Sequence, residues 1–214
     1  DFAVLSHAHY DHANGMEKFF EINRKATFYL QEGCGENCYF KKGFIRKYIG
    51  IPKGITKKYQ DRIEYVSGVY TVADGIYLVS HSTPHLEQIG KKEMMYQKTK
   101  LGWKPDNFCH EQSLVLDTDG GLVIFNSCSH GGVVNIINEV KAAFPNKKIT
   151  ALIGGFHIFN HPEAEIRELA KLIKETGIER IYTGHCSKER GYRILREELG
   201  DMAGQFYVGM ELVF

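Results

Sequence analysis

The sequence lacks any apolar run approaching the roughly 18 residues that a membrane-spanning helix needs. It also lacks a positively charged leader followed by an apolar segment, the mark of a signal peptide. We therefore expect a cytoplasmic protein with no membrane partner.

An excess of charge of either sign is also missing. Lys and Arg number 27 and Asp and Glu 26, which leaves a net charge of +1. Outside residues 41–58, which carry several Lys and Arg, no basic stripe is present. Such a chain has no general attraction for nucleic acid, so we expect a small-molecule substrate that is bound locally.

The number of cysteines is odd, so they cannot all pair in disulfides within the chain. The chain has 5 cysteines, and Cys128 and Cys186 adjoin histidines, which favours reduced thiols over a disulfide framework. Cys34 and Cys38 are four residues apart, but no second pair follows, which disfavours a structural zinc there.

The stretch Leu5–His12 reads LSHAHYDH and directly follows a short apolar run. It carries four side chains of metal-binding type: His7, His9, Asp11 and His12. In an extended turn His7 and His9 point the same way, which leaves Asp11 and His12 for a second ion. The spacing therefore predicts a site for two metal ions.

The rest of the chain alternates apolar segments with turns. With 214 residues, of which 43% are hydrophobic, one domain with a substantial core is expected. The pattern predicts a helix over residues 14–22, a hairpin through 119–121 and a terminal strand or pair over 205–214. Residues 31–61 are expected to form a surface excursion, and residues 84–108 a mobile loop over the site.

Four further motifs place a histidine near the end of an apolar segment. They are Phe108-Cys109-His110-Glu111, Cys128-Ser129-His130-Gly131-Gly132, Gly154-Gly155-Phe156-His157 and Thr183-Gly184-His185-Cys186. Glycines in such turns allow the backbone to approach an ion or ligand closely. Several histidines at strand ends indicate that they contribute to one metal-binding site.

The HxHxDH motif resembles the signature of the metallo-β-lactamase superfamily, whose members are mostly dinuclear metal hydrolases. The later motifs are similar to those of the branch related to the dihydropteridine-ribofuranosylaminobenzene phosphate synthases. The resemblance implies an α+β fold, a four-layer αββα sandwich forming a single domain over residues 1–214. Members carry several strands ahead of the motif, so we expect this chain to lack its N-terminal strands. With an exposed core, it would have to associate, as in a homo-oligomer, or aggregate.

Carried over by resemblance, His7 and His9 bind the first metal, and Asp11 and His12 the second. The resemblance assigns His130 to the first site and His185 to the second. The bridging aspartate expected after Asn126 is absent, so His157 and His110 stay open as alternative ligands, His157 also as a substrate contact.

The expected cofactors are two divalent metal ions, with zinc favoured and iron, manganese or nickel open. The predicted function is that of a metal-dependent hydrolase or transferase, which activates water or stabilises a leaving group on a small phosphorylated or ester-containing substrate, pterin-related in one interpretation. Asp11 is the expected catalytic residue, orienting the nucleophile. One alternative is a phosphodiesterase or nuclease. Another is a non-catalytic metal-binding or redox-sensing protein that uses Cys128 and Cys186.

Overall fold

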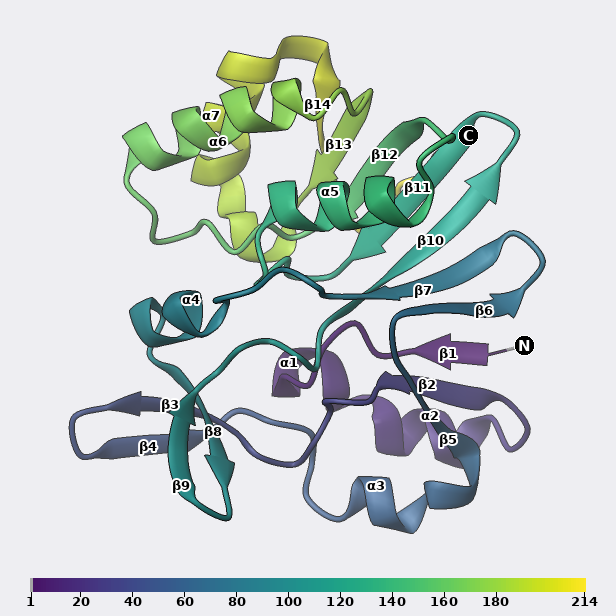
Figure 1. Cartoon of the computed structure of the whole chain (residues 1–214), viewed down its shortest axis with the longest axis vertical. Coiled ribbons are helices and arrows are strands. Elements are labelled where there is room, and N and C mark those ends of the chain that lie inside the picture. The colour runs from purple at the N-terminus through teal and green to yellow at the C-terminus, as the bar shows by residue number, and fades with distance from the viewer. Residues whose placement is uncertain (1) are drawn as a thin grey trace. The chain divides into compact units, whose positions relative to one another are not determined.

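The computed structural model describes residues 2–214 and divides into two compact units. Unit 1 comprises Asp1–Gly68 and Ser80–Gln112, and unit 2 comprises Val69–Val79 and Ser113–Phe214. Figure 1 labels their helices and strands. A single domain over the whole chain stays a prediction.

Unit 1 contains two sheets. Its strands are β1 (Phe2–Val4), β2 (Thr27–Gln31), β3 (Cys38–Lys42), β4 (Ile45–Tyr48), β5 (Ile63–Val66), β8 (Met95–Thr99) and β9 (Gly102–Pro105). A parallel sheet has the order β1-β2-β5, and an antiparallel sheet has the order β4-β3-β8-β9. Because parallel strands need a crossover between them, β1 and β2 are joined through helices.

Unit 1 also contains helices. They are α1 (Tyr10–Ala13), α2 (Met16–Ile22), α3 (Ile55–Lys58) and α4 (Glu87–Lys92), with a short 3-10 turn η1 (Gln60–Arg62). Helix α4 packs against β8 and β9 of the antiparallel sheet. Helix α2 confirms the helix predicted over 14–22, since Met16 and Phe20 are buried one turn apart. The Phe20 ring stacks on Tyr59 at 4.3 Å and lies 5.3 Å from the Phe28 ring. This aromatic cluster fixes the helix against β2.

The segments expected as an excursion and a loop have more regular structure than the sequence indicated. Residues 31–61 contain β3, β4 and α3, and residues 84–108 contain α4, β8 and β9. These strands are four or five residues long, and β4 is largely exposed. Short strands without a buried face leave no alternation for a sequence pattern to reveal.

Unit 2 is built on one seven-stranded mixed sheet. Its strands are β6 (Val69–Ala73), β7 (Ile76–Ser80), β10 (Gln112–Thr118), β11 (Gly121–Asn126), β12 (Ile149–Gly154), β13 (Arg180–Thr183) and β14 (Ala203–Gln205). The order is β14-β13-β12-β11-β10-β7-β6. Strands β11 to β14 pair in parallel, and β10 and β11 form the predicted antiparallel hairpin.

Helices return the chain between the parallel strands of unit 2. They are α5 (Val133–Ala143), α6 (Glu163–Glu175) and α7 (Lys188–Leu199), with 3-10 turns η2 (His185–Ser187) and η3 (Gly200–Met202). Leu122 and Ile124 of β11 share a core with the apolar stripes of all three helices, and Figure 1 shows α5 running alongside β11 and β12. Val123, between them, packs in a separate cluster, as the alternation of a strand requires.

The C-terminal segment differs from the prediction. A strand covers only Ala203–Gln205, and residues 206–214 form no strand. Met210, Leu212 and Phe214 instead pack their side chains against the Val123 cluster. The apolar residues that alternate in this segment pack their side chains on the sheet, but the backbone does not pair with it as a strand. Across residues 2–214, no helix has the length and apolar character needed to traverse a membrane.

Replacement of Leu152 tests the unit 2 core. Leu152 is fully buried in β12, whereas Leu172 of α6 is 40% exposed. We expect Leu152→Ala to lower the free energy of unfolding by about 2–5 kcal/mol, because it leaves a cavity that the sheet cannot close. The matched variant Leu172→Ala should cost less than about 1 kcal/mol. Urea unfolding followed by circular dichroism measures both, and equal effects would contradict this core assignment.

Candidate functional site

The HxHxDH stretch forms the connection between β1 and α1 in unit 1. Its ends are fixed by backbone hydrogen bonds. The Leu5 N–H donates to the Tyr29 carbonyl at 3.0 Å, and the Tyr10 N–H donates to the Ile49 carbonyl at 2.8 Å. Between these points the loop leaves the sheet, so its inner backbone groups need partners from elsewhere.

Those partners come from residues about a hundred positions later in the chain. The Gln112 N–H donates to the Ser6 carbonyl at 2.8 Å, and Gln112 Nε2 donates to the Leu5 carbonyl at 3.0 Å. The Ala8 N–H donates to His110 Nδ1 at 3.1 Å. The backbone on either side of His7 is therefore held in one conformation.

Two imidazoles of this loop gather with that of His12, which lies on α1. The His7 ring centroid lies 4.8 Å from that of His9 and 4.4 Å from that of His12. His7 and His9 are 0% and 4% exposed. Burial first, then the neighbouring imidazoles, hold the pKa of His7 well below its usual value, and burial and His110 lower the pKa of His9 to about 3. Both rings are therefore neutral at physiological pH, the form that coordinates a metal ion.

Asp11 differs from these histidines in being exposed. It lies on α1 with its Oδ2 3.5 Å from His12 Nε2. Both side chains project from the first turn of a helix whose N-cap is His9. A carboxylate beside an imidazole offers oxygen and nitrogen ligands to one ion. The donor set of unit 1 therefore fits a divalent metal.

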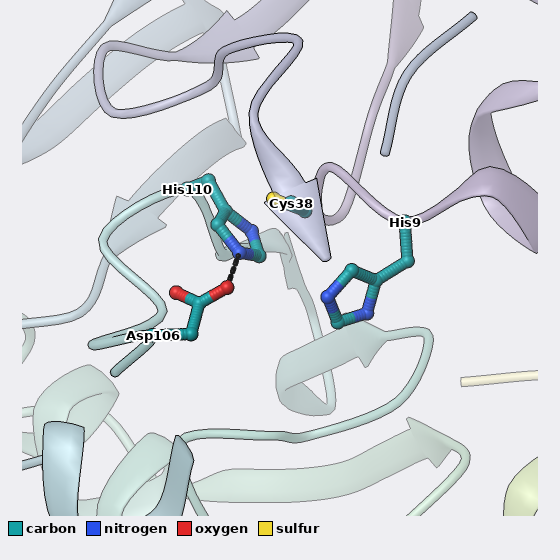
Figure 2. Close-up of side chains that lie close together, drawn as sticks. All are labelled: His9, Cys38, Asp106 and His110. Atoms are coloured by element: carbon teal, nitrogen blue, oxygen red, sulfur yellow. Dashed lines mark hydrogen bonds and ion pairs between the residues drawn. The ribbon is translucent and has the colours of Figure 1, made fainter. Parts of the chain in front are cut away.

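Both ring nitrogens of His110 have hydrogen-bond partners, and one of these bonds holds the loop between β1 and α1. Nδ1 accepts the Ala8 N–H, so the proton is assigned to Nε2, which lies 3.1 Å from Asp106 Oδ2 (Figure 2). The other oxygen of Asp106 accepts the Phe108 N–H at 2.9 Å and Gln97 Nε2 at 2.8 Å. Burial raises the pKa of Asp106, but His110, His9 and the Phe108 N–H outweigh it and lower the value to about 2.

Cys38 extends this group, as Figure 2 shows. His9, Cys38, Asp106 and His110 each place one potential ligand atom within 4.8 Å of the others, and all four are buried. Burial raises the pKa of the Cys38 thiol. Cys38 therefore lies with the histidine motif, and this grouping was not predicted from its spacing to Cys34.

In unit 2, three parallel strands deliver the remaining predicted histidines. The carboxyl ends of β11, β12 and β13 lead into the loops that carry His130, His157 and His185. The His130 and His157 ring centroids are 4.2 Å apart. His130 is buried, His157 is half-buried, and His185 is exposed. The structure thus brings His130 and His157 together, as the strand-end pattern suggested for parallel neighbours.

Two buried thiols meet at the same strand ends. Cys128 Sγ and Cys186 Sγ are 3.4 Å apart, and the His157 N–H donates to Cys186 Sγ at 3.2 Å. The hydrogen bond with Cys128 lowers the pKa of Cys186, burial raises it, and His157 lowers it further, to about 5.

Asn126 ends β11, just before the region where the resemblance expects a bridging aspartate. Its Oδ1 accepts the Ser129 N–H at 2.7 Å, and its Nδ2 donates to Ser113 Oγ at 3.1 Å. Asn126 therefore shapes the loop that carries Cys128 and His130.

The sequence analysis did not single out several residues that the structure places at these sites. Asp106 and Gln112 orient the motif loop, and Glu111 pairs with His81 at 2.5 Å in the interior of unit 1. The one local signal was the i, i+4 spacing of Asp106 and His110. The metal and catalytic roles assigned to His7, His9, Asp11, His12, His110, His130, His157 and His185 stay predictions.

The chain was compared with known proteins. No protein-family model matches it. A 7,8-dihydropterin-6-methyl-4-(beta-D-ribofuranosyl)-aminobenzene-5'-phosphate synthase of Methanocaldococcus jannaschii is 26% identical over 231 aligned positions, which cover 100% of this chain and 75% of that protein. An uncharacterized protein of the same organism is 26% identical over 193 positions, 87% of this chain and 69% of that protein.

A solved structure described as a metal-dependent hydrolase of the beta-lactamase superfamily matches with a TM-score of 0.82. The match covers 99% of this chain and 78% of that chain at 24% identity. The chain has the metallo-β-lactamase fold. This confirms the α+β fold predicted from the HxHxDH motif, and the similarity to the pterin-related synthase confirms the resemblance drawn from the later motifs.

The Asp106 carboxylate predicts a pH dependence of stability. Its folded pKa of about 2 lies below its ordinary value of 3.8, so the folded chain favours the ionised form more than the unfolded chain does. The resulting stabilisation is complete above about pH 4 and is lost as the pH falls through about 2. We expect Asp106→Asn to destabilise the protein at neutral pH, with a difference from wild type that shrinks towards pH 2.

Urea unfolding at a series of pH values measures this difference. The matched control is Asp61→Asn, since Asp61 is exposed in the same unit. A difference between wild type and Asp106→Asn that does not change with pH would contradict the assignment.

Proposed function

We propose that the protein is a metal-dependent enzyme that acts on a small phosphorylated or ester-containing molecule. The observation that carries the proposal is the cluster of His7, His9 and His12, in which the His9 and His12 ring centroids lie 4.8 and 4.4 Å from that of His7. Burying the His7 and His9 imidazoles costs them their hydration. Coordination of a cation compensates that loss.

The proposed ligands in unit 1 follow from this cluster. His7 and His9 bind one divalent ion, and Asp11 and His12 bind another. The assignments of His130 and His185 remain those made from the sequence. A bound ion supplies Lewis acidity that polarises a carbonyl or phosphoryl oxygen. Zinc suits the imidazole donors, and iron, manganese or nickel are also compatible.

Other residues of unit 1 position these ligands. His110 accepts the Ala8 N–H, between the two buried histidines, and Asp106 holds the His110 ring. We infer that His110 is a positioning residue, because both of its ring nitrogens are engaged in these bonds. Asp11 is exposed beside His12 and can accept a proton from an attacking water or hydroxyl group.

The substrate class is proposed from the relatives. The name of the relative that is similar over the whole chain describes a synthase whose product joins a dihydropterin to a ribofuranosyl-aminobenzene phosphate. That similarity supports a phosphorylated, pterin-related substrate and a transferase activity. The likeness to a metal-dependent hydrolase in fold supports hydrolysis as the alternative reaction.

Metal content tests the proposed ligands. We expect the double variant His9→Ala/His12→Ala to lose about two metal ions per chain relative to wild type, because each proposed site loses an imidazole. The matched control is His85→Ala/His161→Ala, whose side chains are 74% and 27% exposed. Elemental analysis of the purified proteins gives the counts. Equal metal content in all three proteins would overturn the ligand assignment.

Turnover tests the reaction class. We expect the wild-type protein to act on a member of a panel of phosphoesters, lactones and pterin pyrophosphates, to stop after chelation and to recover with Zn²⁺. Asp11→Asn should lower kcat by about 100-fold or more with a smaller effect on KM, because the residue assists the chemical step. Asp61→Asn is the matched control. Full turnover after complete removal of metal would exclude the proposed mechanism.

A further inference from the structure

Three loops of unit 2 bring two sulfur atoms and one imidazole together. Cys128 follows β11, His157 follows β12 and Cys186 follows β13. One ligand atom from each lies within 4.8 Å of the other two. Because all three residues belong to unit 2, their arrangement is set by the pairing of adjacent strands.

The distances fit a metal ion better than a disulfide. In a tetrahedral zinc site with Zn–S bonds of about 2.3 Å, two coordinating sulfurs lie about 3.8 Å apart. A disulfide requires about 2.05 Å. The observed Sγ–Sγ separation is 3.4 Å. The thiols therefore need a shift of a few tenths of an ångström to share an ion, and more than 1 Å to form a bond.

The backbone around the sulfurs is shaped for close approach. A Cβ on Gly155 would lie 2.5 Å from Cys186 Sγ, so only glycine leaves room for that sulfur. Ser129, His157 and His185 have φ values of 50°, 51° and 51°, which L-residues rarely adopt. Strained residues in all three loops that meet at this point are typical of a functional site rather than of ordinary packing.

We propose that Cys128, His157 and Cys186 form a metal site for a thiophilic divalent ion such as Zn²⁺. Two thiolates and one imidazole are a soft donor set, unlike the imidazole and carboxylate set of the HxHxDH motif. Binding of the ion forms two metal–sulfur bonds and one metal–nitrogen bond and releases to solvent any proton that the two sulfurs still carry, with no change of oxidation state.

Three protein ligands leave one position of a tetrahedral ion open. Cys128 and Cys186 are 3% and 8% exposed, whereas His157 is half-buried. His157 is therefore the most exposed of the three proposed ligands, and its ring lies 4.2 Å from that of His130. The site shares no ligand with the set proposed for unit 1, so this inference does not rest on the proposed function.

Cobalt substitution tests the site directly. The metal-free protein is loaded with Co²⁺, and the near-ultraviolet absorption of thiolate-to-cobalt charge transfer is recorded. We expect this band in wild type. The variant Cys128→Ser/Cys186→Ser should lose the band and should bind about one ion per chain fewer than wild type. The matched double variant Cys34→Ser/Cys109→Ser should retain the band. The band should also persist in His9→Ala/His12→Ala, which separates this site from the proposed histidine site.

A single variant covers the case in which the double serine variant does not fold. His157→Gln should retain the sulfur band but weaken Co²⁺ binding by about tenfold or more, because it removes one of three protein ligands. Circular dichroism verifies the fold of each variant.

Three results would overturn the proposal. The first is a wild-type protein loaded with Co²⁺ that shows no thiolate band. The second is a band that survives Cys128→Ser/Cys186→Ser and disappears in Cys38→Ser, which would place the sulfur ligand in unit 1. The third is a Cys128–Cys186 disulfide found by mass spectrometry in the metal-loaded protein, which would make the pair a redox element.

Discussion

The hydrogen bonds that hold the loop between β1 and α1 are the constraint on which the histidine cluster depends. Between Leu5 and Tyr10 the backbone leaves the sheet, yet His7 and His9 are buried there. A buried loop needs a partner for each backbone group. Gln112 pairs with the Leu5 and Ser6 carbonyls, and the His110 ring pairs with the Ala8 N–H. Two imidazoles can therefore stay close together without a regular element beneath them.

Sequence patterns predicted the parts of the structure that depend on local order. The stripe of α2 and the turn between β10 and β11 each act within about ten residues, and both predictions are confirmed. The supports of the loop depend instead on distant pairing, since Ala8 and His110 are 102 positions apart. No local pattern marks Gln112 as the residue that reaches the Leu5 carbonyl. The exposed strand β4 was not predicted for a different reason: it has no buried face, so its sequence shows no apolar alternation.

In unit 2, the backbones of β11 and β12 are in close contact at the point where both strands end. A Cβ on Gly154 would lie 1.7 Å from the Asn126 carbonyl oxygen, and Gly154 has a φ of 153°. Only glycine permits β11 and β12 to meet this closely where both strands end. The sequence analysis interpreted these glycines as positions of close backbone approach. In the structure, Gly154 lies against the neighbouring strand β11, and Gly155 lies against the Cys186 sulfur. Close strand ends give the following loops little freedom, which fixes the direction of the side chains they carry.

The two units collect different donors by the same physical means. In unit 1, burial lowers the pKa of His7 and His9, which favours the neutral form of both rings. In unit 2, Cys128 and Cys186 are equally shielded, but sulfur is the more polarisable donor. Because affinity for the first-row metals follows one general order, a protein distinguishes ions through donor type and geometry. A chain that separates an imidazole and carboxylate set from a thiol and imidazole set can therefore hold ions of different softness in each unit.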